Sequence, residues 1–463
     1  MRQIVRKYPR FFLLVTLAAI GLRLLFIVRF PSVTTDSFIY GDIAKNWLLH
    51  GVYAVSDGAT IVPTWIRLPG YPAFLAAIFA LFGMEHYRAV LFVQLLVDLG
   101  TCFLVADVAR RVVSERATRT VFLLAALCPF LANYVAAALT ETLEVFFTVL
   151  ALDLAIVGLA AFHSGKKRAW AGCGLAIAGA ILLRPDGGLL LIAFEVYLAL
   201  ILFRRWRARL PLLPVIWPAM IIATIALAPL VPWTLRNLAT LHRFEPLAPR
   251  YANEENEFVP AGFNRWIKTW IAEYASVEEV YWAVPGSNVD VDKLPLRAFD
   301  SEEQRDATEQ LLSDYNDVQH VTPELDARFA ALATQRIQHA PVRYYLWLPA
   351  LRIADMWLRP RTEMLPSDSR WWEFDDDPKW SALAVGMGVI GLFYVMTAFL
   401  GLARGRFSPA LSLLLTFVIV RTAFLGTLEN PEPRYTLECY PVVIVLAAAW
   451  FGRDRSQGDD PTG

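Results

Sequence analysis

The sequence predicts an all-α protein that crosses a membrane many times. Of its 463 residues, 56% are hydrophobic and only 19% are charged, whereas a typical soluble domain has about 25% charged residues. The hydrophobic residues form runs that approach the roughly 20 apolar residues needed for a membrane-spanning helix. Helices are expected in these runs because a helix satisfies its own backbone hydrogen bonds in lipid, and the sequence lacks the alternation of a membrane β-barrel.

Ten membrane spans are predicted from these runs. They lie at 11–29, 88–109, 119–134, 141–162, 169–184, 187–203, 212–233, 381–402, 408–425 and 437–452. The first run resembles the start of a signal peptide, but it is long and no small-residue cleavage site follows it. We therefore interpret it as an uncleaved span.

The distribution of Lys and Arg predicts the orientation of these spans. Basic residues fill the N-terminus, the connections after spans two, four, six and eight, and the C-terminal tail. The short connections on the other side contain only Arg184 and Arg434. Since cytoplasmic loops are rich in Lys and Arg, both termini are expected in the cytoplasm.

Composition narrows the function classes. The formal net charge is zero, which gives no reason to expect a nucleic-acid partner. The four cysteines lie in or beside apolar runs and show no CxxC spacing; they are Cys102, Cys128, Cys173 and Cys439. They are expected to pack between helices as small apolar residues, so neither a disulfide framework nor a zinc site is predicted.

The spans divide the chain into four parts. Residues 1–233 carry spans one to seven and include a long outer connection, 30–87. Residues 234–380 form a large extracytoplasmic loop region, 381–452 carry the last three spans, and 453–463 form a polar cytoplasmic tail. The chain is therefore expected to expose two long segments on the outer side.

The first outer segment contains two predicted helices. Residues 36–49 show apolar residues at helical spacing, Ile39, Ile43 and Trp47, which predicts a helix lying on the surface with a face able to dock on lipid. The apolar stretch 68–82 is too short to span a membrane and is expected to form an interfacial or re-entrant helix.

Two further helices are expected in 234–380. One begins at Thr322-Pro323, because a hydroxyl cap followed by proline is typical of a helix start, and its apolar face comprises Leu325, Phe329 and Leu332. The other follows Pro341 and is rich in aromatic residues, namely Tyr344, Tyr345, Trp347 and Trp357. Aromatic amphipathic helices favour the membrane interface.

Four polar clusters are predicted to share the outer side. They are Asp36 with Tyr40 and Asp42, Arg67 with Tyr71, Glu141 with Arg184, and Glu432 with Arg434 and Tyr435. Arginine binds phosphate through a planar, bidentate fork, and a carboxylate can act as general base toward a hydroxyl. A site with both suits transfer of a sugar from a lipid phosphate, because that leaving group needs charge stabilisation more than it needs a proton.

Each of these residues also has a structural interpretation. Asp36 could cap the helix that follows it, and Asp42 could be a solvated residue of that helix. Glu141 could lie in the first turn of span four, where the helix dipole favours an acid. Arg67, Arg184 and Arg434 could extend their charges to the membrane interface. The convergence of the clusters on one side favours the functional interpretation.

The order of these motifs along the chain resembles a known family. The motifs are Asp36, Tyr40, Ala44-Lys45-Asn46-Trp47-Leu48, Gly51-Val52-Tyr53, Arg67-Leu68-Pro69-Gly70-Tyr71-Pro72, Thr140-Glu141, Arg184-Pro185 and Glu432-Pro433-Arg434-Tyr435. The chain is similar to the membrane-embedded glycosyltransferases of the C-type fold. It most resembles the bacterial relatives of dolichyl-phosphate-mannose protein mannosyltransferases and of the lipid A aminoarabinose transferase. The resemblance covers spans one to seven and part of span ten.

This resemblance implies a C-type glycosyltransferase fold and makes residues 1–233 the catalytic module. Because the relatives named are bacterial, it also implies a bacterial inner (plasma) membrane, with the active site on the extracytoplasmic face. It implies a polyprenyl-phosphate sugar donor carrying a hexose or pentose, and inversion at the anomeric carbon. The acceptor hydroxyl would belong to a lipid, a glycan or a protein. The residues matching family positions are Asp36 as general base, Glu141 as second acid, Arg184, Arg434 and Arg67 at the donor phosphate, and Tyr40, Asp42, Tyr71, Glu432 and Tyr435 at the substrates.

The chain departs from the family pattern at the base. Relatives often have two adjacent acids in the first outer loop, whereas here Ser37 follows Asp36. No required cofactor and no metal-ligand set are therefore predicted, and the use of a divalent metal is left open. Three other classes also remain: a transporter or flippase, an O-antigen polymerase or ligase-like enzyme, and a non-catalytic scaffold. A transporter is disfavoured because the charged residues gather at one rim and the halves show no repeat.

Overall fold

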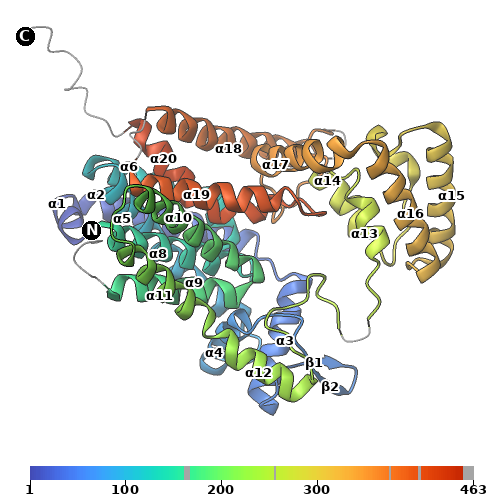
Figure 1. The fold of residues 1–463 in the computed structure, drawn as a ribbon, viewed down its shortest axis with the longest axis horizontal. Helices are drawn as coiled ribbons and strands as arrows, with labels where there is room; N and C mark the ends of the chain where they lie inside the picture. Colours follow the sequence, from blue (N-terminus) through green and yellow to red (C-terminus); the bar gives the residue numbers. More distant parts are fainter. Residues whose placement is uncertain (161–166, 255–256, 375–376, 405–407, 452–463) are drawn as a thin grey trace, which may run out of the picture. The chain divides into compact units, whose positions relative to one another are not determined.

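A computed structural model describes residues 1–160, 167–254, 257–374, 377–404 and 408–451, and the predicted tail 453–463 lies outside these residues. The described chain consists of helices and one antiparallel two-stranded hairpin (Figure 1). It divides into two compact units. Unit 1 comprises 1–254, 393–420 and 437–463, and unit 2 comprises 255–392 and 421–436.

Unit 1 contains most of the apolar helices. The helices of this unit, apolar or not, are α1 (Arg2–Lys7), α2 (Pro9–Arg29), α3 (Thr35–His50), α4 (Gly70–Phe82), α5 (Tyr87–Val112), α6 (Glu115–Ala126), α7 (Pro129–Tyr134), α8 (Glu141–Ala160), α9 (Lys167–Leu183), η1 (Pro185–Gly187), α10 (Gly188–Arg207), α11 (Leu213–Leu227), α12 (Leu230–Leu241) and α20 (Tyr440–Phe451). Strands β1 (Ala54–Asp57) and β2 (Thr60–Pro63) form the hairpin. Helices α18 (Pro378–Arg404) and α19 (Pro409–Leu425) and the turn η6 (Pro433–Cys439) each belong partly to unit 1 and partly to unit 2.

Helices occupy all ten of the predicted spans, but the segments differ in length. Seven described helices are long and apolar enough to cross a membrane. Helices α9 and α19, which occupy two more predicted spans, have 17 residues each. The predicted span 119–134 is not one helix, since it breaks into α6 and α7 at Leu127 and Cys128. The chain is thus an integral membrane protein, and α4 is the short apolar helix that was predicted at 68–82.

A buried arginine stabilises the break between α6 and α7. Proline at the start of α7 cannot continue a helix because it lacks a backbone N–H, so the last carbonyls of α6 need other donors. Arg23 of α2, which is fully buried, donates to the carbonyls of Ala125 and Ala126. Its Nε also donates to Asp98 of α5 at 2.7 Å. One ion pair therefore joins α2, α5 and the end of α6.

Helix α3 confirms the predicted helix at 36–49, but its apolar face does not dock on lipid. Ile43 is completely buried in a cluster with Tyr53, Trp65 and Trp233. Trp47 contacts Tyr53 edge to face, with ring centroids 5.4 Å apart. The expectation that this face docks on lipid was wrong at Ile43, because Tyr53 and Trp65, which flank the hairpin, and Trp233 of α12 pack around it.

Unit 2 contains most of the segment 234–380, which was predicted to be a large extracytoplasmic loop region, while residues 234–254 belong to unit 1. Its elements are α13 (Ala261–Ile267), α14 (Tyr274–Ser276), η2 (Val277–Tyr281), η3 (Val291–Lys293), η4 (Leu296–Ala298), α15 (Glu302–Val318), α16 (Pro323–His339), η5 (Arg343–Trp347) and α17 (Leu348–Leu358), together with the start of α18 and the end of α19. The start predicted for α16 is confirmed, because Thr322 caps it by accepting from the Leu325 amide. Phe329 of α16 packs in a hydrophobic core against Trp266 and Trp270.

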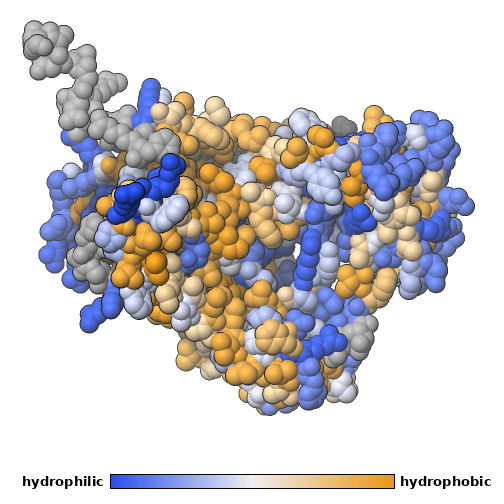
Figure 2. Space-filling model, viewed as in Figure 1, coloured by the Kyte–Doolittle hydropathy of each residue, from blue (hydrophilic) through white to orange (hydrophobic). Residues whose placement is uncertain are grey.

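Surface hydropathy separates these elements. Figure 2 shows hydrophobic colours along α18, whereas hydrophilic colours dominate over α15 and α16. Helix α15 is a surface helix with acids in its first turn. The part of unit 2 built from α15 and α16 is thus suited to water, while its span α18 is suited to lipid.

Candidate active site

Asp36 lies in the first turn of α3 but does not cap it. The N-cap residue is Thr34, whose backbone N–H donates to the Ser37 hydroxyl at 3.0 Å, as in a capping box. Asp36 therefore does not fulfil the capping role that is its structural alternative. Its carboxylate stands near a helix N-terminus, where the dipole stabilises negative charge.

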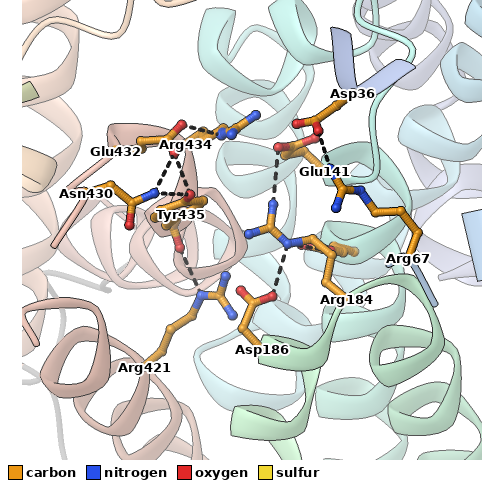
Figure 3. Close-up of polar contacts among 11 residues, drawn as sticks. Asp36, Arg67, Glu141, Arg184, Asp186, Arg421, Asn430, Glu432, Arg434 and Tyr435 are labelled. Carbon is orange, nitrogen blue, oxygen red and sulfur yellow. Dashed lines mark hydrogen bonds and ion pairs between the residues drawn. The ribbon is translucent and has the colours of Figure 1, made fainter. Parts of the chain in front are cut away.

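Arg67 fixes the Asp36 carboxylate. Its Nη2 lies 2.7 Å from Asp36 Oδ1 (Figure 3). Its guanidinium lies over the Tyr40 ring, 5.6 Å from the ring centroid. Asp36 keeps 37% of its side chain exposed, against 17% for Arg67. Burial raises the pKa of Tyr40, so this phenol stays neutral at physiological pH. The Asp36 carboxylate is therefore held in one orientation by the less exposed Arg67 guanidinium and remains partly accessible.

Two residues predicted to bind substrate have structural partners. Asp42 accepts from the backbone N–H and the hydroxyl of Ser56, at 2.6 and 2.7 Å, and so holds β1 against α3. Tyr71 is fully buried and donates to Gln94 Oε1 at 2.8 Å. Its ring contacts Tyr40 edge to face at 5.0 Å. Asp42 thus positions β1 beside α3, and Tyr71 supports the ring of Tyr40, one turn after Asp36.

A second polar group surrounds Arg184, which precedes η1. Arg184 Nη1 lies 3.6 Å from Glu141 Oε1, and its Nε lies 3.4 Å from Glu144 Oε1 and 3.0 Å from Asp186 Oδ1. Figure 3 shows the Arg184 guanidinium between Glu141 and Asp186. Glu141 and Glu144 are one helical turn apart at the start of α8 and are almost fully buried, so one arginine bridges three carboxylates.

Several carboxylates of this group lie close together. Oxygens of Glu144, Asp186 and Glu438 all lie within 4.8 Å of one another, and Arg184 is the cation whose contacts to this group are described. Burying several carboxylates together is costly unless protons or cations neutralise their negative charge. These three carboxylates are the described residues that could hold a divalent ion, since oxygen ligands suit Mg²⁺ and Mn²⁺.

The backbone links the Asp36 side of the site to the Glu141 side. Ser32, just before α3, pairs with the irregular segment that precedes Glu141: its N–H donates to Ala136 O at 2.8 Å, and its carbonyl accepts from Ala138 N at 3.0 Å. Gln94, which is fully buried in α5, donates to Val135 O at 3.2 Å and to Ala137 O at 2.7 Å. Non-helical backbone at membrane depth needs such partners.

A third polar group belongs to unit 2. Glu432 Oε2 lies 2.6 Å from Arg434 Nε, and Glu432 Oε1 accepts from the Tyr435 hydroxyl. Asn430 Nδ2 donates to Glu432 Oε1 at 3.2 Å, and Arg421 Nε donates to the Tyr435 carbonyl at 2.9 Å (Figure 3). The predicted cluster of Glu432, Arg434 and Tyr435 is thus one hydrogen-bonded group.

Each arginine proposed for phosphate binding contacts a carboxylate: Arg67 contacts Asp36, Arg184 contacts three acids, and Arg434 contacts Glu432. The sequence reasoning did not single out Glu144, Glu438 or Gln94. The spacing of Glu144, three residues after Glu141, was a usable signal because such residues share a helix face. Glu438 gave a weaker signal, as an acid within an apolar stretch.

Comparison with known proteins supports this architecture. Residues 63–233 match the model of the dolichyl-phosphate-mannose-protein mannosyltransferase family. The match covers less than half of the chain and ends in α12. A comparison with curated proteins found no match.

Solved structures of similar fold are larger proteins. Archaeal oligosaccharyltransferase AglB from Archaeoglobus fulgidus, in complex with an inhibitory peptide and a dolichol-phosphate, has a TM-score of 0.53 and 13% identity, covering 96% of this chain and 50% of its own. The same enzyme tethered to an acceptor peptide has a TM-score of 0.53 and 12% identity, and the match covers 96% of this chain and 49% of the AglB chain. ArnT from Cupriavidus metallidurans bound to undecaprenyl phosphate has a TM-score of 0.40 and 15% identity, and the match covers 95% of this chain and 77% of the ArnT chain.

These similarities define the class of the protein. It is an integral membrane protein with the C-type glycosyltransferase fold, as the sequence predicted. The chain spans about half the length of the AglB structures it matches. At these identities the likeness concerns the fold, so activity must be argued from the site.

Proposed function

We propose that the protein transfers a sugar from a polyprenyl-phosphate donor to a hydroxyl acceptor on the extracytoplasmic face of the membrane. The observation that carries the proposal is the Asp36–Arg67 pair at 2.7 Å, an exposed carboxylate oriented at the start of α3. A C-type fold with dolichol-phosphate bound in AglB supports a lipid-linked donor.

The proposed chemistry assigns the proton to Asp36. The acceptor oxygen attacks the anomeric carbon while its proton passes to the Asp36 carboxylate. The bond between the anomeric carbon and the phosphate oxygen breaks, and polyprenyl phosphate leaves with the electron pair. Attack from the side opposite the phosphate inverts the anomeric centre. Positioned general bases contribute about 10² to 10⁴ in rate, and the contact with Arg67 supplies the positioning.

The phosphate needs positive charge as it leaves. Among the described ion pairs, Arg67 and Arg434 each contact one carboxylate, whereas Arg184 contacts three. A phosphate beside Arg184 would also lie near the three carboxylates that Arg184 contacts, and like charges repel. We therefore favour Arg67 over Arg184 as the phosphate contact in unit 1 and propose that Arg184 holds Glu141 in place. The phosphate role expected for Arg434, which belongs to unit 2, stays a prediction.

The proposal is tested by incubating the purified, lipid-reconstituted protein with a panel of polyprenyl-phosphate hexoses and pentoses and with lipid, glycan and peptide acceptors. Release of polyprenyl phosphate together with a glycosylated acceptor is expected for at least one donor. Movement of intact lipid-linked sugar across the bilayer, with no cleavage of any donor, would instead identify a flippase.

A further inference from the structure

The continuous helical segment Val342–Leu358, made of η5 and α17 in unit 2, has an unusual distribution of side chains. Its exposed residues recur every four positions, which is one helix face; they are Val342, Leu346, Ala350, Ala354 and Leu358. Val342 and Leu346 are each 67% exposed, and the neighbouring Tyr345 and Trp347 are 65% and 61% exposed. We call this set of seven residues the 342–358 face.

All charged residues of the same segment point inward or are paired. Arg352 is fully buried and donates to the carbonyls of Ile271, Lys268 and Gly426, at 2.9, 2.6 and 3.4 Å. Arg343 forms a bidentate pair with Asp300, at 2.6 and 3.0 Å.

The remaining charge is Asp355, which accepts from the Tyr274 amide at 2.9 Å. The helix is therefore polar on its buried side and uncharged on its exposed side. This is the reverse of a helix that faces water.

The 342–358 face adjoins elements of the same unit that enter the membrane. Arg352 donates to Gly426, directly after α19, and a side chain at Gly426 would collide with Ile353 of α17. Pro360, two residues after α17, lies against Gly388 of the span α18. In this half of α18, Val389 is 61% exposed, as expected of a lipid-facing residue.

We propose that the 342–358 face contacts lipid acyl chains, so that α17 lies in the outer leaflet as a membrane-embedded anchor of unit 2. A contiguous apolar patch needs a partner. The lack of any exposed charge favours acyl chains over headgroups, and Tyr345 and Trp347 are the residue types that line the membrane interface. The segment is about 25 Å long at 1.5 Å per residue, so it is short for an upright crossing and suits a tilted or interfacial position.

Spin labels at single cysteines test the proposal in lipid nanodiscs. The four native cysteines are buried, so labels will react at Leu346→Cys or Leu358→Cys. Leu296→Cys is the matched control, because Leu296 is an apolar residue of the same unit that is 87% exposed. At positions 346 and 358, collisions with oxygen should exceed those with a water-soluble nickel chelate, by a ratio several-fold higher than at position 296.

Two outcomes would overturn the proposal. If the labels at 346 and 358 meet the nickel chelate as often as the label at 296, the face lies in water. If both reagents are excluded and dipolar coupling appears between labels on two protein molecules, a second copy of the chain covers the face. The substituted side chains are exposed, so each variant is expected to fold as the parent does. Thermal unfolding of the labelled protein checks this.

Discussion

Replacing Gln94 with methionine should both destabilise the protein and slow its reaction. Gln94 donates to Val135 O and Ala137 O and accepts from the Tyr71 hydroxyl. Methionine has a similar length but cannot make these bonds. The backbone before Glu141 and the Tyr71 ring below Tyr40 would both lose their anchor.

The structure sets the size of the effect. Ala137 O also accepts from the Leu139 amide at 2.8 Å, so it keeps one partner in the variant. The Val135 carbonyl and the Tyr71 hydroxyl would lose their hydrogen bonds to Gln94 while their residues remain fully buried. An unsatisfied buried polar group costs about 1–3 kcal/mol, so the two groups together should lower the free energy of unfolding of Gln94→Met by roughly 2–6 kcal/mol. Displacing a catalytic group by about 1 Å can cost 10²-fold in rate.

Tyr71→Phe is the matched control. It removes the same hydroxyl contact but leaves both backbone bonds of Gln94 in place, so it should cost about 1–2 kcal/mol and reduce kcat far less. Unfolding is followed by SDS titration in mixed micelles, and kcat and KM are measured on the folded fraction. If Gln94→Met unfolds within about 0.5 kcal/mol of the parent and keeps its kcat, Gln94 does not position the segment before Glu141.

Arg23→Met should lower the free energy of unfolding by about 3–5 kcal/mol because it leaves Asp98 buried without its partner. Changing Asp98→Leu as well should recover only part of the loss, since the carbonyls of Ala125 and Ala126 still lack the donor; equal stability of the single and double variants would contradict the pairing. Asp42→Ala should increase hydrogen exchange of the β1 amides, since Asp42 holds that strand; unchanged exchange would return Asp42 to the candidates for substrate binding. A cysteine at the exposed residue Ser287 should label with an impermeant thiol reagent in intact cells, whereas one at Lys7 should not; labelling of both would refute the predicted orientation.

The fold was largely predictable because apolar runs report directly on membrane spans. All ten segments are helical, and the helix starting at Thr322 begins where its cap and proline indicate. The break between α6 and α7 was missed, since the apolar run continues through it and the stabilising contact comes from Arg23, about a hundred residues away. The lipid docking of α3 was wrongly expected because nothing local indicates that Trp233 covers Ile43.

The site was predictable only in part. Its outer acids and arginines stood out because charge is rare in this chain, and the Arg67–Asp36 and Glu432–Arg434 contacts join residues named from the sequence. The contact between Arg184 and Glu141 also lies within one predicted cluster, whereas the contact with Glu144 was not foreseen, because which acid an arginine meets depends on tertiary packing. The roles of the site residues remain predictions.

The central claim is that Asp36 accepts the proton of the acceptor hydroxyl, and Asp36→Asn tests it most directly. Asn preserves shape and suits the first turn of a helix, while Thr34 rather than Asp36 caps α3, so the variant should insert and unfold as the parent does. Asn cannot take the proton, and we expect kcat to fall about 10² to 10⁴-fold with little change in donor KM. Asp57→Asn, in the exposed end of β1, is the control and should keep parental turnover. A folded Asp36→Asn protein with near-parental kcat would contradict the account and move the search for the base to Glu141.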